Sequence, residues 1–369
     1  YLRGKNGEQK FYIDNVGRIS EIISSTDSVA GDDLYLSIDA DLQKATYLAL
    51  QNEIAAIVYS NIKSGEIPIN DVYTALIGNS VINTEHFSKS KASDTEKSVL
   101  SVFKSRQKTT LGKIKQELTS SPEALNTMSD EVLDEFTYII SMLKDDQVLL
   151  KNEIDTSDSV YQKWKDQKIS PKEYLNYCIT QHWIDISQLN VDEKYADSTE
   201  VYDALCKYIL KNIKTDTEFS KIIYQYMITR GEISPRQLCL ILFDQGVLDY
   251  DDATVNKLKN GSLSPRDFLM KKIYNIEITP AQLALEPCIG SCVVTDEKTG
   301  EIRAMVSYPG YDSNKLANGV DSEYFASLQH DKSSPLLNYA TQQKTAPGST
   351  FKLVSATAGL AENVITTSD

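Results

Sequence analysis

The feature that constrains this chain most is a break in regular backbone structure, followed at once by an apolar helical pattern, near residue 350. Residues 345–356 read Thr-Ala-Pro-Gly-Ser-Thr-Phe-Lys-Leu-Val-Ser-Ala. Pro347 and Gly348 interrupt any preceding helix or strand, and the apolar spacing after them predicts a helix. The pattern therefore places Ser349 at the start of a helix, with Lys352 one turn further along on the same face.

This arrangement suits nucleophilic catalysis. A serine hydroxyl becomes an effective nucleophile when a neighbouring base removes its proton. A lysine is such a base only in its neutral form, which burial and the positive end of a helix both favour. The first turn of a helix also leaves backbone N–H groups without partners, and these can hold a developing oxyanion. We therefore predict Ser349 as the nucleophile, Lys352 as the general base and the N–H of Ser349 as one oxyanion donor.

The Ser-x-x-Lys spacing alone proves nothing, because it recurs in the chain. We interpret the other occurrences as exposed helical or loop residues, since only Ser349 follows a Pro-Gly break with apolar helix positions after it. These other pairs are Ser60/Lys63, Ser88/Lys91, Ser101/Lys104, Ser105/Lys108 and Ser141/Lys144.

The context of Ser349 resembles a known motif. Residues 336–341 (Leu-Leu-Asn-Tyr-Ala-Thr) and 346–352 (Ala-Pro-Gly-Ser-Thr-Phe-Lys) resemble the first active-site motif of the penicillin-binding proteins, especially the class B transpeptidases. Tyr-Leu-Arg-Gly at residues 1–4 and the segment 31–43 also look like this family. There they mark the end of a non-catalytic pedestal and the first helix of the transpeptidase domain. The resemblance covers residues 1–55 and 278–369.

The residue pattern of these two regions predicts strands and one helix. Residues 1–38 read as short strands with tight turns, and the alternation of Leu34, Leu36 and Ile38 predicts a strand. Asp39 is a candidate N-cap for the helix that follows. Residues 291–294 and 301–307 predict a hairpin with its turn at 296–300, which is similar to the first hairpin of the family's catalytic domain.

Between these regions lies a domain-sized stretch, residues 60–277, that reads as helical. Four helices in this stretch or just after it are predicted to begin with Ser or Thr followed by Pro. At Ser170, Ser234 and Thr279 a Glu or Gln three residues on predicts a capping box, while Asp267 makes the opening at Ser264 a weaker variant. Their uneven spacing does not indicate a regular repeat. The aromatic residues here would also suit a carbohydrate platform, but helical spacing favours the core and its rim.

Composition excludes several functions. The net charge of −14 argues against a nucleic-acid or anionic-membrane surface. No apolar run approaches a membrane span, and no signal peptide is visible. Cys288 and Cys292 would lie about 13 Å apart along a strand, too far to pair. Neither the cysteines nor His86, His182 and His330 have metal-ligand spacing, so we expect no metal and no cofactor.

Some positions depart from the family's pattern. Lys298-Thr299-Gly300 spells the family's third motif, but it precedes Ser349 and lies in a charged turn, so we interpret it as non-catalytic. No Ser-x-Asn follows Lys352. Tyr339 stands where the family usually has arginine, and residues 343–345 (Gln-Lys-Thr) replace its usual glycine-containing turn.

We therefore expect a helix-dominated α+β chain: a small β pedestal remnant, a large all-α insertion and an incomplete penicillin-binding α/β domain. The expected domains are residues 1–38 (pedestal end), 39–59 (first helix of the transpeptidase domain), 60–277 (helical insertion) and 278–369 (first hairpin and Ser-x-x-Lys helix).

The resemblance implies peptidoglycan cross-linking by a D,D-transpeptidase through an acyl-enzyme on Ser349, with D-Ala-D-Ala stem peptides as substrates and β-lactams as inhibitors. It further implies the extracytoplasmic face of a bacterial membrane, an N-terminal anchor outside this sequence, and partners such as a glycosyltransferase or division and elongation proteins. The chain itself is expected to be inactive. Two alternatives remain: a β-lactam sensor or serine β-lactamase, and a non-enzymatic scaffold of the cell-wall machinery that acts through its helical insertion.

Overall fold

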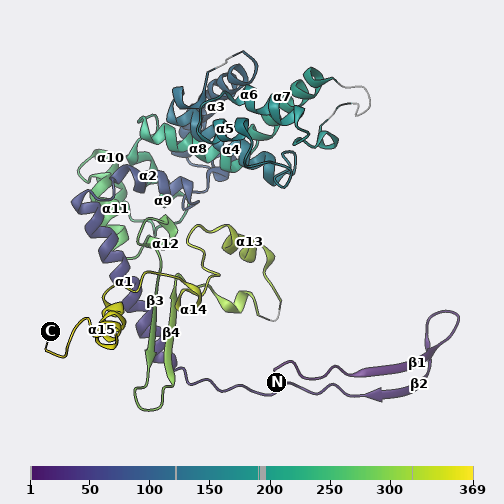
Figure 1. Cartoon of the computed structure of the whole chain (residues 1–369), viewed down its shortest axis with the longest axis vertical. Coiled ribbons are helices and arrows are strands. Elements are labelled where there is room, and N and C mark those ends of the chain that lie inside the picture. Colours follow the sequence, from purple (N-terminus) through teal and green to yellow (C-terminus); the bar gives the residue numbers. More distant parts are fainter. Residues whose placement is uncertain (1, 121–122, 190, 192–196, 318, 369) are drawn as a thin grey trace. The chain divides into compact units, whose positions relative to one another are not determined.

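The computed structural model describes residues 2–120, 123–189, 191, 197–317 and 319–368, so Tyr1 and Asp369 lie outside the described residues. The chain divides into two compact units (Figure 1). The sheet unit comprises Tyr1–Leu50, Ser291–Tyr308 and Asn338–Asp369, and the helical unit comprises Gln51–Gly290 and Pro309–Leu337. Helices predominate and the strands form two small sheets, which confirms the predicted helix-dominated α+β class.

The sheet unit begins with an antiparallel hairpin of strands β1 (Glu8–Ile13) and β2 (Ile19–Thr26). Asp14 closes its turn, because its carbonyl accepts the N–H of Gly17 at 3.1 Å, and Gly17 has a φ of +81°. Glycine adopts this left-handed conformation without a steric cost. All residues of both strands are exposed.

The strand predicted from Leu34, Leu36 and Ile38 is wrong. These residues belong to no strand, and Leu34 and Leu36 are exposed. The segment instead makes isolated hydrogen bonds to the start of strand β4 (Ile302–Tyr308). Ser37 Oγ donates to the carbonyl of Ile302 at 2.7 Å, and the N–H of Asp39 donates to the carbonyl of Arg303 at 2.8 Å. Alternation predicts a strand only where a ladder partner is available.

Helix α1 (Ala40–Ser64) begins where Asp39 caps it, as predicted. The Asp39 carboxylate accepts the N–H groups of Asp41 and Leu42, both at 3.0 Å. Strands β3 (Gly290–Thr295) and β4 (Ile302–Tyr308) form the predicted hairpin. The buried residues of β4 alternate along the strand, and the ring of Tyr308 lies 5.7 Å from that of Tyr47 on α1. Figure 1 shows this hairpin beside the first turns of α1.

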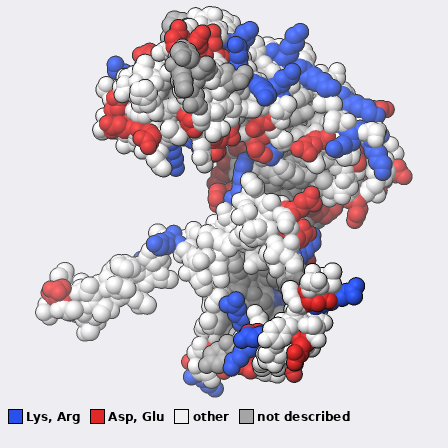
Figure 2. Space-filling view, turned by 90° about the vertical axis from the view of Figure 1, so that its right-hand side faces the viewer, with Lys and Arg blue, Asp and Glu red and all other residues white. Residues whose placement is uncertain are grey.

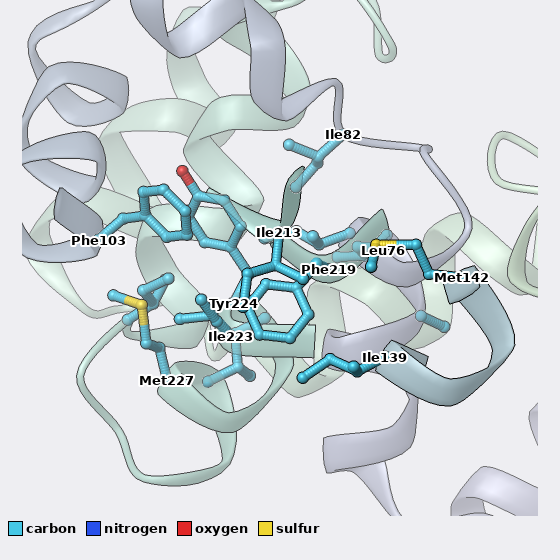
Figure 3. Packing of buried hydrophobic residues seen from close by; sticks show 14 of the residues in the cluster. Leu76, Ile82, Phe103, Ile139, Met142, Ile213, Phe219, Ile223, Tyr224 and Met227 are labelled. Carbon is cyan, nitrogen blue, oxygen red and sulfur yellow. The ribbon is translucent and has the colours of Figure 1, made fainter. Parts of the chain in front are cut away.

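The helical unit consists of helices packed around one apolar core. Phe103 and Tyr224 stack with their ring centroids 4.1 Å apart, and Ile213, Phe219 and Met227 lie in the same core (Figure 3). The helices that build the unit after α1 are α2 (Ile69–Gly78), α3 (Asp94–Thr119), α4 (Asp130–Asp145), α5 (Ser159–Lys165), α6 (Pro171–Thr180), α7 (Ser198–Ile213), α8 (Thr217–Thr229), α9 (Pro235–Asp244), α10 (Asp252–Asn260), α11 (Pro265–Tyr274), α12 (Pro280–Leu283) and α13 (Ser322–His330).

The predicted Ser/Thr-Pro helix starts are present, with one correction. Ser234 and Thr279 form complete capping boxes, and Ser264 accepts the N–H of Asp267. Ser170 accepts the N–H of Glu173, but the Glu173 side chain does not complete the box, so the prediction was wrong in that half. Position N3 supplies a capping box only when its side chain folds back onto the N-cap.

Several helices end in the same way. Gly231, Gly246 and Ile276 each have a positive φ, and two residues after each comes an isoleucine or leucine that is buried. A left-handed residue ends a helix and turns the chain sharply. The buried residue then fixes the turn against the core before the next helix begins.

The domain boundaries at residues 60 and 277 stay a prediction. The predicted insertion lies within the longer segment of the helical unit, but this unit also includes residues 309–337. There Lys332 Nζ donates to the carbonyl of Gly78 at 3.4 Å.

Candidate active site

The segment around Ser349 is built from three short elements of the sheet unit. Helix α14 (Tyr339–Gln342) is capped by Asn338, whose side-chain oxygen accepts the N–H of Ala340 at 3.1 Å. Residues 343–347 have no regular structure. A 3₁₀ turn, η5 (Gly348–Phe351), then leads directly into helix α15 (Lys352–Ala361).

Ser349 lies in the first turn of this helical segment, and Lys352 is the first residue of α15. Pro347 ends the irregular segment, and Gly348 has a φ of +58°, which favours glycine. The N–H of Lys352 donates to the carbonyl of Ser349, which keeps the two residues one turn apart. The sequence pattern therefore located this helix start correctly.

The two side chains are exposed and make no hydrogen bond to each other within the described part of the chain. The structure therefore places Ser349 and Lys352 at the same helix start, but their side chains are not hydrogen-bonded to each other. The backbone N–H of a residue this near a helix start has no intrahelical partner. The N–H of Ser349 is thus of the kind that can hold an oxyanion.

The apolar side chains around this pair are also uncovered. Phe351, Leu353 and Val354 are 51%, 78% and 54% exposed. Burying an apolar side chain of this size contributes about 1.5–3 kcal/mol. Because three such groups within about one helical turn stay in water, the described residues do not provide the opposing wall of a closed catalytic cleft.

The other Ser-x-x-Lys pairs lie in different surroundings. Ser60, Ser101, Ser105 and Ser141 lie inside helices α1, α3 and α4, and all four are exposed. A serine inside a helix has its own N–H engaged by the carbonyl four residues earlier. Such a serine cannot offer that N–H to an oxyanion, which separates these sites from Ser349.

The Lys298-Thr299-Gly300 sequence forms the β3–β4 turn. The N–H groups of Lys298 and Thr299 donate to the carboxylate of Asp296 at 2.8 and 3.0 Å, and Gly300 has a φ of +75°. These residues are exposed and serve to close the hairpin.

Tyr339, the departure from the family's arginine, is buried at the start of α14. Its backbone N–H donates to Ser307 Oγ on strand β4 at 3.0 Å. Ser307 thus positions the segment that leads to Ser349. Nothing in the sequence pattern singled it out, since a serine on a strand reads as an ordinary polar position.

Within the described ranges, no group of three or more His, Cys, Asp or Glu side chains has the arrangement of a metal site. The five cysteines are free thiols. Among the described residues, no helix combines the length and apolar character needed to cross a membrane.

Comparison with known proteins finds similarity in the last part of the chain. The sequence model of the penicillin-binding protein transpeptidase domain matches residues 290–369. Residues 290–369 are thus similar to the transpeptidase domain of the penicillin-binding proteins. We call them the transpeptidase segment. It contains strands β3 and β4, helix α15 and the Ser349 helix start.

Curated relatives agree with this family. The chain is 44% identical over 77 residues to the peptidoglycan D,D-transpeptidase PbpA of Mycolicibacterium smegmatis, and 43% identical over 74 residues to the peptidoglycan D,D-transpeptidase MrdA of Escherichia coli. Each alignment covers 20% of this chain, but only 16% of PbpA and 12% of MrdA. No solved structure matches the chain.

Proposed function

We propose that the transpeptidase segment carries the nucleophile of a peptidoglycan D,D-transpeptidase, and that this nucleophile is Ser349. The observation that supports this most is its position, directly after the Pro347-Gly348 break and in the first turn of a helix. The other Ser-x-x-Lys pairs on α1, α3 and α4 lie inside helices, where the N–H of serine is not free to bind an oxyanion.

The reaction follows from these groups. Ser349 Oγ attacks the carbonyl carbon of the penultimate D-Ala of a stem peptide, and Lys352 Nζ takes the hydroxyl proton. The N–H of Ser349 donates to the resulting oxyanion. The peptide C–N bond then breaks, the terminal D-Ala leaves with a proton on its amine, and an ester to Ser349 remains.

Transfer completes the cycle. The amine of a neighbouring stem peptide attacks the ester, forms the cross-link and returns the proton and the free hydroxyl to Ser349. A β-lactam enters the same first step, but its ring opens without releasing a leaving group, so the ester persists. This chemistry makes the protein a target of β-lactams.

The family also suggests where the whole protein works. Peptidoglycan stem peptides lie outside the cytoplasmic membrane, so we place the protein on the extracytoplasmic face, held by an N-terminal anchor outside this sequence. A glycosyltransferase, or proteins of cell division or elongation and cell shape, would be its partners there. Residues 60–277 would then be a helical insertion within its transpeptidase domain.

Fluorescent penicillin tests the proposal on a protein in which this sequence continues through a complete transpeptidase domain. We expect stoichiometric labelling that Ser349→Ala abolishes and Ser105→Ala leaves intact. Lys352→Ala should slow acylation by about 10²- to 10⁴-fold, the usual contribution of a general base.

The outcomes separate the alternatives. Rapid release of hydrolysed penicillin would identify a β-lactamase. A stable adduct with no transfer of stem peptides would identify a sensor. Full labelling of the Ser349→Ala variant would refute Ser349 as the nucleophile, and no labelling of the unaltered protein would favour a scaffold that acts through its helical insertion.

A further inference from the structure

Helix α3 carries a concentration of positive charge that the proposed function does not use. Residues 97–116 contain five lysines and one arginine and no aspartate or glutamate, in a chain whose net charge is −14. The arginine, Arg106, turns inward and pairs with the buried Glu131 at 3.0 Å. The lysines are exposed.

Four of these lysines lie in a single row. At about 100° per residue, Lys97, Lys104, Lys108 and Lys115 point in directions that differ by no more than about 40°. A rise of about 1.5 Å per residue gives a row about 27 Å long, with gaps of about 10, 6 and 10 Å. We call these four residues the lysine row.

The residues beside the row are small and leave it accessible. Ser101, Ser105 and Gly112 lie on the same side of α3 and are exposed, and the space around Gly112 is open. Of the acidic residues of this helix, Glu96 and Glu117 are buried, and Asp94 in the first turn is exposed. The fifth lysine, Lys113, also lies off the row, and its charge acts on Glu135.

No lysine of the row is paired with a carboxylate within the described part of the chain. None of its four ammonium groups forms an ion pair or hydrogen bond there, whereas Lys168, Lys221 and Lys272 each pair with a carboxylate. Figure 2 shows that lysine and arginine side chains gather in a stripe on the helical unit. Like charges about 6–10 Å apart repel one another, so an added anion relieves this repulsion.

We propose that the lysine row binds a linear polyanion, a polymer that carries phosphate or carboxylate groups along its length. A single file of charges along one helix matches a chain that lies parallel to the helix axis. A bilayer surface would call for a basic patch extended in two dimensions, with apolar side chains that reach the lipid. This inference does not depend on the proposed transpeptidase activity.

Fluorescence anisotropy with labelled polyphosphate and labelled poly-glutamate tests the proposal on the full chain. The variant changes all four row lysines to glutamine. Its matched control changes four exposed lysines of α7 and α10 to glutamine (Lys207, Lys211, Lys257 and Lys259). Both proteins have the same net charge, and circular dichroism melts should show that both stay folded.

We expect one or both polymers to bind, and the row variant to lose at least about tenfold in affinity at low salt. The slope of log K against log salt should fall by about 3 units, because four phosphate contacts to a flexible polymer each contribute about 0.7. The control should keep both the affinity and the slope. Comparing the two polymers identifies phosphate or carboxylate as the preferred group.

Three results would overturn the proposal. Equal weakening of binding by the control and by the row variant would assign binding to net charge alone. Competition by inorganic phosphate as strong as that by the polymer, at the same phosphate concentration, would show that a linear arrangement of charges is not needed. Binding to anionic phospholipid vesicles, with no binding to either polymer, would assign the surface to a membrane.

Discussion

Gln43 on helix α1 forms two hydrogen bonds with the backbone of Met305 on strand β4. Its Nε2 donates to the carbonyl of Met305 at 2.7 Å, and its Oε1 accepts the Met305 N–H at 2.7 Å. The two residues lie 262 positions apart in the sequence. The sheet unit is therefore assembled from segments on both sides of the long helical stretch, and Gln43 joins them as an added strand would.

Replacing Gln43 with alanine should destabilise the sheet unit by about 1–3 kcal/mol, because it leaves a partly buried N–H and carbonyl without partners. Urea denaturation followed by the near-UV signal of Tyr47 and Tyr308 would measure this. Lys44→Ala, at an exposed position on the same helix, is the control and should change stability by less than about 0.5 kcal/mol. Equal effects of the two changes would contradict the role given to Gln43.

The helical unit should unfold on its own as one cooperative transition. Its core is continuous from α2 to α11, so we expect residues 60–277, expressed alone, to be helical and to melt in one step. Phe103→Ala should lower the stability of this segment by about 3–5 kcal/mol, because it removes the ring stacked on Tyr224. Val102→Ala, at the neighbouring exposed position, should have little effect. A gradual, coil-like trace would show that the segment depends on its flanking chain.

The stability of the helical unit should fall as the pH rises from about 5 to 8. Burial is the main reason that the pKa of Glu135 rises to about 8, and the neighbouring Glu131 carboxylate adds to it. Lys113 and Arg106 oppose this shift, and Asp134 reinforces it. One Glu135 oxygen, Oε1, has no hydrogen-bond partner among the described residues.

The sign follows from proton linkage. An unfolded glutamate has a pKa of about 4.3, so between that pH and about 8 the folded state binds more protons than the unfolded state. The contribution of protonated Glu135 to the free energy of unfolding is on the order of a few kcal/mol. It is complete below about pH 4 and is lost as the pH rises through 8. Glu135→Gln keeps the shape of the protonated form, so it should remove this slope in pH-dependent urea melts. An unchanged slope would mean that another titrating side chain causes the dependence of stability on pH.

Much of the fold could be predicted from local sequence signals. The Asp39 cap, the β3–β4 hairpin and the Ser-Pro helix starts depend on a few neighbouring residues, so their patterns were readable. Leu34 and Leu36 alternate in the same way as strand residues, but no ladder forms there, because pairing depends on a distant partner. The burial of the Glu135 carboxylate could not be predicted from the sequence either, since a glutamate on an amphipathic helix normally faces water.

The candidate site likewise combines features that local sequence predicts with features that it does not predict. The Pro347-Gly348 break fixed the position of Ser349 at a helix start, because backbone restriction acts locally. The hydrogen bond from the N–H of Tyr339 to Ser307 Oγ joins residues 32 positions apart, so the local sequence pattern does not predict it. The distance between Ser349 Oγ and Lys352 Nζ depends on what covers α15, which local spacing does not encode.

A polypeptide of residues 1–369 alone should react with penicillin at least about 10²-fold more slowly than a protein in which the sequence continues through a complete transpeptidase domain. An oxyanion hole needs a second donor opposite the N–H of Ser349, and one such donor contributes about 10² to 10³ in rate. Helix α15 also has no opposing wall among the described residues, since Leu353 and Val354 are exposed. Labelling with fluorescent penicillin over time gives both rates. Stoichiometric labelling of residues 1–369 within minutes would show that the short segment suffices.

The central claim is that Ser349 is the residue that forms the acyl-enzyme. Its most direct test is peptide mass spectrometry after penicillin treatment of the protein with a complete transpeptidase domain. We predict one adduct, on the peptide that contains Ser349, and none on peptides that contain Ser60, Ser101 or Ser105. An adduct on any of those three serines, with the Ser349 peptide unmodified, would contradict the account.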